Sequence, residues 1–143
     1  RDVSLAELEA AWDELDPTCR KRARHVLTEN DRVRQGVAAL RIGDLKRFGA
    51  LIAASHASSR DDFENSSPAL DALVEVAEGA PGFLGAKLSG AGWAGCTVNL
   101  VEPDKAEEFA EAVRHGYFRL RGVAPDVHVC RAADGASARP LDA

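Results

Sequence analysis

The sequence has no methionine, and it is poor in the residues that mark several specialised classes of protein. Its three cysteines (Cys19, Cys96 and Cys130) are far apart and odd in number, so they fit neither a disulfide framework nor a zinc site. We expect packed, reduced thiols in a reducing compartment such as the cytoplasm. No apolar run approaches the roughly 20 residues of a membrane span, and no stretch resembles a secretory signal peptide.

The chain also lacks an excess of positive charge. Its formal net charge is −5, which argues against a nucleic-acid binder because no basic face is implied. With 143 residues, 45% of them hydrophobic and 29% charged, it is long enough for one soluble domain with a core. Because the chain begins at Arg1-Asp2-Val3 with no initiator, we expect a piece of a longer polypeptide, although processing would look the same.

Two helices are predicted in the first 41 residues. Ser4 and Glu7 have the spacing of a capping box, and the helix they open ends at Asp16-Pro17. Its apolar stripe is Leu5, Leu8, Trp12 and Leu15. A longer helix is predicted from about 18 to 40, with a basic first half, Arg20 through Arg24, that is expected to be a solvated face. Its buried side is expected to hold Val26, Val33, Val37 and Leu40.

A third helix is predicted from about Leu45 to Asp61, and its inward face changes from apolar to polar along its length. The stripe begins with Leu45, Phe48 and Ile52 and continues onto Ser55, His56 and Ser59. This face either approaches a wet site or leaves the core with His56 merely hydrogen-bonded. Adjacent Asp61 and Asp62 point about 100° apart on a helix, so we interpret them as a capped or salt-bridged turn and expect no metal site.

The second half of the sequence predicts an α+β domain. Ser67-Pro68 opens a helix that runs to about Glu78, and 104–121 forms the most clearly amphipathic helix. Strands are predicted at 83–88, 96–101 and 126–132 from their β-branched, alternating pattern. We expect an antiparallel sheet with helices on one face (67–132), preceded by a helical segment (4–62). The tail, 133–143, is small and polar and is expected to be poorly ordered.

Between the first two predicted strands lies a glycine-rich stretch, Ser-Gly-Ala-Gly-Trp-Ala-Gly-Cys at Ser89–Cys96. It matches G-x-G-x-x-G, but a dinucleotide site requires a helix after the loop, and here a strand follows. Two interpretations stay open. The glycines serve a hairpin turn or relieve crowding against a helix. Alternatively, their N–H groups form an anion nest that presses against a bound phosphate.

Several separate blocks of the sequence resemble the C-terminal half of the galactokinases, which belong to the GHMP superfamily of small-molecule kinases. The resemblance covers nearly the whole chain, and its blocks occur in the same order. The blocks are 22–26 (Arg-Ala-Arg-His-Val) with 28–30 (Thr-Glu-Asn), 55–66 (Ser-His-Ala-Ser-Ser-Arg-Asp-Asp-Phe-Glu-Asn-Ser), 68–71 (Pro-x-Leu-Asp), 85–98 (Gly-Ala-Lys-Leu-Ser-Gly-Ala-Gly-Trp-Ala-Gly-Cys-Thr-Val), 129–132 (Val-Cys-Arg-Ala) and 134–136 (Asp-Gly-Ala).

The resemblance implies a ferredoxin-like GHMP kinase C-terminal domain over 1–132. It implies transfer of the γ-phosphoryl group of ATP to the anomeric hydroxyl of galactose, with Mg²⁺. The loop would lie near substrate and nucleotide, with Ser55 and His56 packed behind it. The loop residues are Ser89, Gly90, Ala91, Gly92, Trp93, Ala94 and Gly95. In the family, the phosphate loop, the catalytic aspartate and the sugar-binding carboxylates belong to an N-terminal domain. We therefore expect no catalytic residue in this chain, and the isolated 143 residues are expected to be inert.

Two positions depart from the family pattern, and other functions stay open. The family commonly has glycine at Ala94 and often phenylalanine at Trp93, which matters for the loop if the first position needs a positive φ. The alternatives are a non-catalytic regulator, a stand-alone interaction module, or a kinase of another sugar such as N-acetylgalactosamine or arabinose. An exposed apolar surface is expected where the N-terminal kinase domain docks, and self-association could follow from it.

Overall fold

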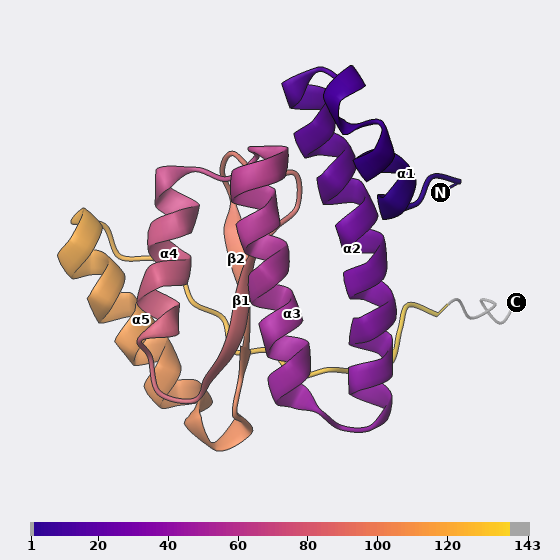
Figure 1. The fold of residues 1–143 in the computed structure, drawn as a ribbon. Helices are drawn as coiled ribbons and strands as arrows, with labels where there is room; N and C mark the ends of the chain where they lie inside the picture. The colour runs from indigo at the N-terminus through magenta and orange to yellow at the C-terminus, as the bar shows by residue number, and fades with distance from the viewer. Residues whose placement is uncertain (1, 138–143) are drawn as a thin grey trace, which may run out of the picture.

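The computed structural model describes residues 2–137 and forms an α+β fold built around one β-hairpin. The elements, in chain order, are α1 (Leu5–Ala10), α2 (Pro17–Arg41), α3 (Leu45–Ser58), α4 (Pro68–Glu78), β1 (Phe83–Ser89), β2 (Cys96–Val101) and α5 (Ala106–Arg121). Helix α2 lies beside α3, which runs along β1. In Figure 1, α4 and α5 lie to the left of the hairpin and α2 and α3 to its right. The predicted layout of helices and hairpin is therefore confirmed.

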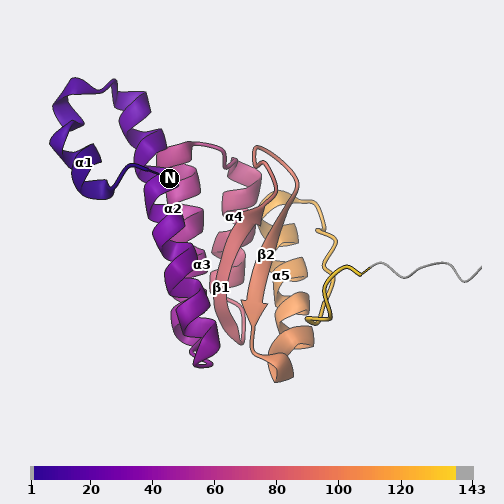
Figure 2. The ribbon, with the colours of Figure 1, turned by 90° about the vertical axis from the view of Figure 1, so that its right-hand side faces the viewer.

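The hairpin is antiparallel, and its register places the small residue Ala86 opposite Asn99. Ala86 is fully buried beneath α4 and α5, whereas Val98, which points to the other face, is 51% exposed. Alternation along a strand sends successive side chains to opposite faces, so helices cover one face and the other is open. In Figure 2, α3 lies to the left of the two strands, next to β1, and α5 lies to their right, next to β2.

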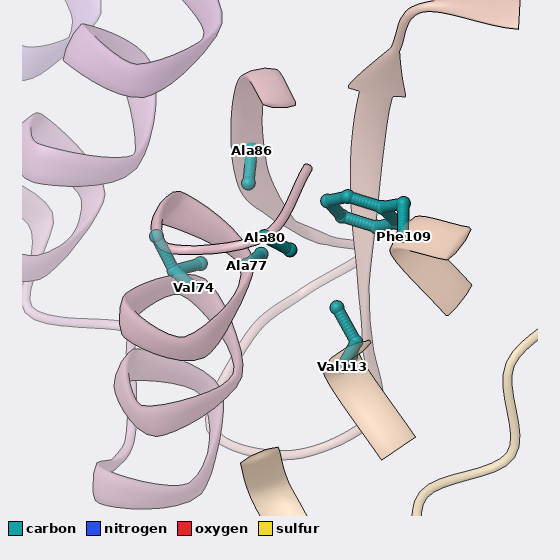
Figure 3. Close-up of a cluster of buried hydrophobic side chains, with 6 residues drawn as sticks. All are labelled: Val74, Ala77, Ala80, Ala86, Phe109 and Val113. Atoms are coloured by element: carbon teal, nitrogen blue, oxygen red, sulfur yellow. The ribbon is translucent and has the colours of Figure 1, made fainter. Parts of the chain in front are cut away.

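The main core forms between α4, β1 and α5. Its buried side chains are Val74, Ala77, Ala80, Ala86, Phe109 and Val113, drawn in Figure 3. Phe109 is the large member, and the alanines let the helices approach the strand closely. In α4 the apolar positions Leu70, Val74 and Ala77 are buried and Leu73 is partly buried. In α5 Phe109 and Val113 are buried, but Leu120, near the end of the helix, is 54% exposed.

Helix α3 and strand β1 touch through their backbones. A Cβ atom on Gly49 would lie 2.0 Å from the carbonyl oxygen of Leu84, and one on Gly85 would lie 2.2 Å from the carbonyl oxygen of Gly49. Such distances leave no room for a side chain at either position. Two glycines thus set the distance between the helix and the strand.

The predicted buried side of α2 is wrong. Val26, Val33, Val37 and Leu40 are between 45% and 65% exposed. The residues of α2 that are buried are Gly36 and Ala39, and a Cβ on Gly36 would meet the Phe48 ring at 3.3 Å. Small residues, rather than the valines, therefore face α3. The apolar stripe is only partly covered by the described residues.

The strand predicted at 126–132 is also wrong. Residues 124–137 form no helix or strand, although Val127 is partly buried against the core and its carbonyl oxygen accepts a bond from Arg114 Nη2 at 3.0 Å. The alternating pattern is present, but the sheet has two strands and offers this segment no ladder. Of the predicted tail, 133–137 is exposed irregular backbone, while 138–143 lies outside the described residues.

Smaller corrections concern the ends of helices and the cysteines. Ser4 forms the predicted capping box with Glu7, but α1 ends at Ala10 and a 3₁₀ turn, Trp12–Glu14, follows it, so the predicted stripe is broken and Leu5 is exposed. Helix α3 ends at Ser58 and passes into a π-helical turn, Ser59–Phe63. The cysteines are free but exposed, not packed. Among the described residues, no helix is long and apolar enough to cross a membrane.

Candidate functional site

The glycine loop, defined as Ser89–Gly95, connects β1 to β2 and depends on left-handed backbone at several positions. Gly90, Gly92 and Gly95 have φ values of +80°, +90° and +105°. Trp93 also has a positive φ, +57°, which is strained for an aromatic residue. Ala94 is not among the positive-φ residues, so the alanine in place of the family's common glycine is compatible with this loop geometry.

Asn65 contacts the glycine loop from both sides of Gly92. Its carbonyl oxygen accepts a hydrogen bond from the N–H of Trp93 at 2.6 Å, and its Nδ2 donates to the carbonyl oxygen of Ala91 at 2.9 Å. A Cβ on Gly92 would lie 2.0 Å from the Asn65 carbonyl oxygen. Gly92 is therefore required by close approach as well as by its φ. Asn65 belongs to the block 55–66 that carries the family resemblance, but no periodicity singled it out, because the contact joins positions 26 residues apart.

The turn that presents Asn65 is held by the basic start of α2. Glu64, whose φ is +58°, accepts hydrogen bonds from Lys21 Nζ at 2.7 Å and from Arg22 Nη2 at 2.6 Å. Arg22 also donates to the carbonyl oxygen of Asp62. These contacts lower the pKa of Glu64, the hydrogen bond from Lys21 being the largest cause. The arginine block interpreted as a solvated face is in fact largely engaged in ion pairs.

Asp62 anchors the same turn from inside. It is 8% exposed, pairs with Arg24, whose Nε lies 3.0 Å from its Oδ1, and accepts a bond from Ser58 Oγ at 3.2 Å. Asp61 is exposed and pairs with its neighbour Arg60 at 2.8 Å. The interpretation of these carboxylates as a salt-bridged turn is confirmed. No group of three histidine, cysteine, aspartate or glutamate residues within 2–137 is arranged to hold a metal.

His56 of α3 lies behind β1 and contacts Leu88, the residue just before the loop. Its Nδ1 accepts a hydrogen bond from the N–H of Leu88 at 3.3 Å, which requires the proton of the neutral ring to sit on Nε2. That nitrogen lies 3.4 Å from Oδ1 of Asp71, an oxygen that also accepts a bond from Ser66 Oγ at 2.5 Å. His56 is 3% exposed, and burial lowers its pKa despite Asp71. The neutral ring therefore links α3 to β1 and lies beside Asp71 of α4.

Ser55 joins a polar cluster beside His56. Its Oγ donates to Glu29 Oε2 at 2.7 Å and accepts from Lys87 Nζ at 2.8 Å. Burial opposes ionisation of Glu29, but hydrogen bonds from Ser55 and Arg32 outweigh it and lower the pKa of Glu29. Of the two interpretations of the α3 face, Ser55 and His56 thus support the strand that leads into the loop, and neither touches the loop directly.

The glycine loop presents backbone N–H groups that are free to bind a ligand. The N–H groups of Gly90, Ala91 and Gly92 find no acceptor among the residues that the structure describes, and Ala91 is exposed. Consecutive free N–H groups in a loop with positive φ values attract anionic oxygens such as those of phosphate. The loop adds no ionisable side chain to this surface, so it can bind or orient a group but cannot transfer a proton.

Comparison with known proteins points to one family. The protein family described as "GHMP kinases C terminal" matches residues 37–118, which include α3, α4, the hairpin and most of α5. A galactokinase of Roseiflexus sp. (strain RS-1) is 47% identical over 135 residues, covering 94% of this chain and 34% of that protein. The chain thus spans about a third of the length of this curated relative.

Solved structures give the same result. The crystal structure of Lactococcus lactis galactokinase complexed with galactose has a TM-score of 0.80 at 40% identity and covers 86% of this chain and 32% of that one. The crystal structure of L. major mevalonate kinase in complex with R-mevalonate has a TM-score of 0.57 at 28% identity, covering 80% of this chain and 35% of that one. With its fold, its glycine loop and these matches in agreement, the chain belongs to the GHMP kinase C-terminal family.

Proposed function

We propose that this chain is the C-terminal part of a galactokinase. In the reaction the anomeric hydroxyl of galactose loses its proton, its oxygen bonds to the γ-phosphorus of ATP, and the bond to the β–γ bridging oxygen breaks to release ADP. The observation that carries the proposal is 47% identity to a galactokinase over 94% of this chain. It is supported by a galactose-bound galactokinase with a TM-score of 0.80.

In this proposal the glycine loop supports the reactants rather than reacting with them. The N–H groups of Gly90, Ala91 and Gly92 face the phosphate and substrate region, and Ser55 and His56 hold β1 behind it. Phosphoryl transfer depends on positioning and charge neutralisation by several groups at once. No cluster of three or more candidate metal ligands lies within residues 2–137, and we place the Mg²⁺ ligands, like the catalytic base, in the part of the kinase that this chain does not contain.

The apolar stripe of α2 is the surface we assign to the rest of the kinase. Val33 is 65% exposed, Val37 45% and Leu40 48%, and an exposed stripe of this kind marks an interaction site. Without the rest of the kinase, the 143-residue chain is expected to self-associate through the same stripe. We place the complete enzyme in the cytoplasm.

The experiment compares two proteins in an assay of galactose-dependent ADP release. We expect the complete polypeptide that carries this chain to phosphorylate galactose, with ³¹P NMR showing the phosphate on the anomeric oxygen. We expect the 143 residues alone to be inactive. Turnover by the 143 residues alone would contradict the assignment of the chemistry to the remainder. Turnover only with N-acetylgalactosamine or arabinose would replace galactose as the substrate.

A second arm tests the loop. Gly92→Val in the complete polypeptide is expected to lower kcat strongly, because its side chain collides with the Asn65 carbonyl beside the nest. Gly43→Val is the matched control, since Gly43 also has a positive φ, +72°, but lies in the turn between α2 and α3 with no atom within 4 Å of its Cβ position. Unchanged kcat and KM in a folded Gly92→Val protein would remove the loop from the site.

A further inference from the structure

Asn65 occupies an unusual position relative to the glycine loop. Its main chain binds Trp93 and its side chain binds Ala91, so one residue contacts both neighbours of Gly92. A single hydrogen bond leaves a chain free to pivot about it. Two bonds on opposite sides of a glycine fix the two peptide planes that flank it, and the first of these planes carries the N–H of Gly92.

The loop has little else to hold it. Within the loop the structure describes one further backbone hydrogen bond, from the N–H of Ala94 to the carbonyl oxygen of Gly92 at 2.7 Å. Three of its seven residues are glycines, which have the largest conformational freedom in a chain. A defined conformation therefore depends on the contacts from Asn65.

The side chain of Asn65 does not serve the stability of the fold in an obvious way. The residue is 7% exposed, and its Oδ1 is buried without a hydrogen-bond partner among the described residues. A buried amide oxygen with no donor is destabilising compared with an apolar group of similar size. Its Nδ2 nevertheless reaches the Ala91 carbonyl, which water would otherwise solvate, since Ala91 is exposed. The Asn65 side chain therefore lowers the stability of the fold while its bond to Ala91 fixes the position of the loop.

The position of Asn65 is itself set at long range. The N–H of Asn65 donates to the carbonyl oxygen of Ser59 at 3.1 Å, which closes the π-helical turn, and Lys21 and Arg22 hold Glu64 next to it. These contacts connect α2 with the loop through one turn. They hold the amide of Asn65 toward the loop.

We propose that Asn65 is a positioning residue for phosphoryl transfer: it holds the glycine loop in the one backbone conformation in which its N–H groups face the transferred group. This inference rests on the proposed galactokinase function and adds to it a residue outside the glycine motif. Asn65 touches no reactant. It acts through the loop backbone, so its loss should affect the rate of the chemical step more than the binding of the sugar.

The test uses Asn65→Val in the complete polypeptide, with Asn99→Val as the matched control. Asn99 also buries an unpartnered Oδ1, but its Nδ2 contacts Thr97 at 3.3 Å within β2 and does not touch the loop. For Asn65→Val we expect kcat to fall about fivefold to tenfold, the loss expected for one hydrogen bond that matters in the transition state. We expect the KM for galactose to stay within about twofold and the urea midpoint to stay equal or rise. Asn99→Val should leave kcat unchanged.

Amide hydrogen exchange provides a readout that does not need activity. In Asn65→Val the amide of Trp93 should exchange faster, because the loop has lost one of its two bonds to residue 65, while it should be unchanged in Asn99→Val. If Asn65→Val does not fold, Asn65→Ser takes its place, since a hydroxyl on Cβ is too short to reach Ala91. An unchanged kcat with unchanged exchange at Trp93 would overturn the proposal. A wild-type polypeptide that fails to phosphorylate galactose would overturn the proposed function instead, and the exchange data would still decide whether Asn65 orders the loop.

Discussion

The N–H of Trp93 donates to the carbonyl oxygen of Asn65 across 2.6 Å, and in doing so holds Trp93 in a left-handed conformation with a φ of +57°. The strain of the glycine loop is therefore placed at an exposed aromatic residue, since 64% of Trp93 is accessible to solvent. Such a conformation persists only where surrounding contacts require it. The position that the family commonly fills with glycine, Ala94, is free of this strain.

This assignment predicts opposite effects of glycine at two adjacent positions. Trp93→Gly should raise the free energy of unfolding by about 1 kcal/mol, because it relieves a left-handed non-glycine residue that buries little surface. Ala94→Gly should lower it by about 0.5 to 1 kcal/mol, because glycine only adds freedom to the unfolded chain there. Urea titration of both variants is the measurement. The reverse order of stabilities would place the strain at Ala94.

Alanine at two glycines of the loop separates backbone strain from collision. Gly90 and Gly92 both have a positive φ, but only at Gly92 would a Cβ meet another group, the carbonyl of Asn65 at 2.0 Å. Gly90→Ala should cost about 1 kcal/mol in the free energy of unfolding, the strain term alone. Gly92→Ala should cost a further amount of about 1 to 3 kcal/mol for the forced shift. Equal losses in urea titration would show that Asn65 does not contact the loop.

The paired aspartates of the turn should differ sharply in their contribution to stability. Asp62→Asn removes the charge opposite Arg24 at a buried site and should lower the free energy of unfolding by about 2 to 3 kcal/mol. Asp61→Asn affects an exposed pair with Arg60, so its effect should stay below about 0.5 kcal/mol. Both substitutions conserve volume, which isolates the charge. Thermal or urea unfolding of the two proteins is the measurement. Similar losses of unfolding free energy would show that Asp62 does not anchor the turn.

His56 predicts a pH dependence of stability. Burial lowers its pKa below the ordinary value of 6.5, so the folded protein binds fewer protons than the unfolded one. The stability that the neutral ring contributes is complete above about pH 6.5 and is lost as the pH falls from there toward the lowered pKa. His25 is shifted in the same direction by burial and adds to the slope.

The measurement is urea unfolding between about pH 7.5 and 5.5, above the range in which carboxylates titrate. His56→Asn keeps an acceptor for the Leu88 N–H but removes the proton-binding ring, so the slope should become shallower. His115→Asn is the control, because His115 is 75% exposed. A slope in His56→Asn that matches the wild type would show that His56 is not the group responsible.

The elements predicted correctly from the sequence are those whose partners lie nearby in the chain. Val74 and Ala77 of α4 are buried because β1 and α5, the elements that cover them, follow soon after α4 in the chain. The stripe of α2 has the same period, but periodicity identifies an apolar face and not the element that covers it. Val33 is therefore exposed while Gly36, which has no hydrophobic side chain to attract notice, faces α3.

The loop between the two strands was predictable from the sequence, but the residues that support it were not. Glycines and a strand on each side of them are local features, and they indicated the loop. Asn65 and Glu64 belong to a turn that a helical pattern through Asp61 cannot show, because a π-helical turn interrupts it. Likewise the alternation at 126–132 is real, but a strand exists only where a neighbour offers its N–H and C=O groups.

The glycine contact between α3 and β1 has a mechanical consequence. Where side chains separate two elements, rotamer changes can absorb a displacement of one of them. Between Gly49 and Gly85 there is no side chain, so no rotamer change can do this. At this contact we expect the helix and the strand to move together as one rigid unit. A displacement of the glycine loop would therefore be passed through β1 to α3.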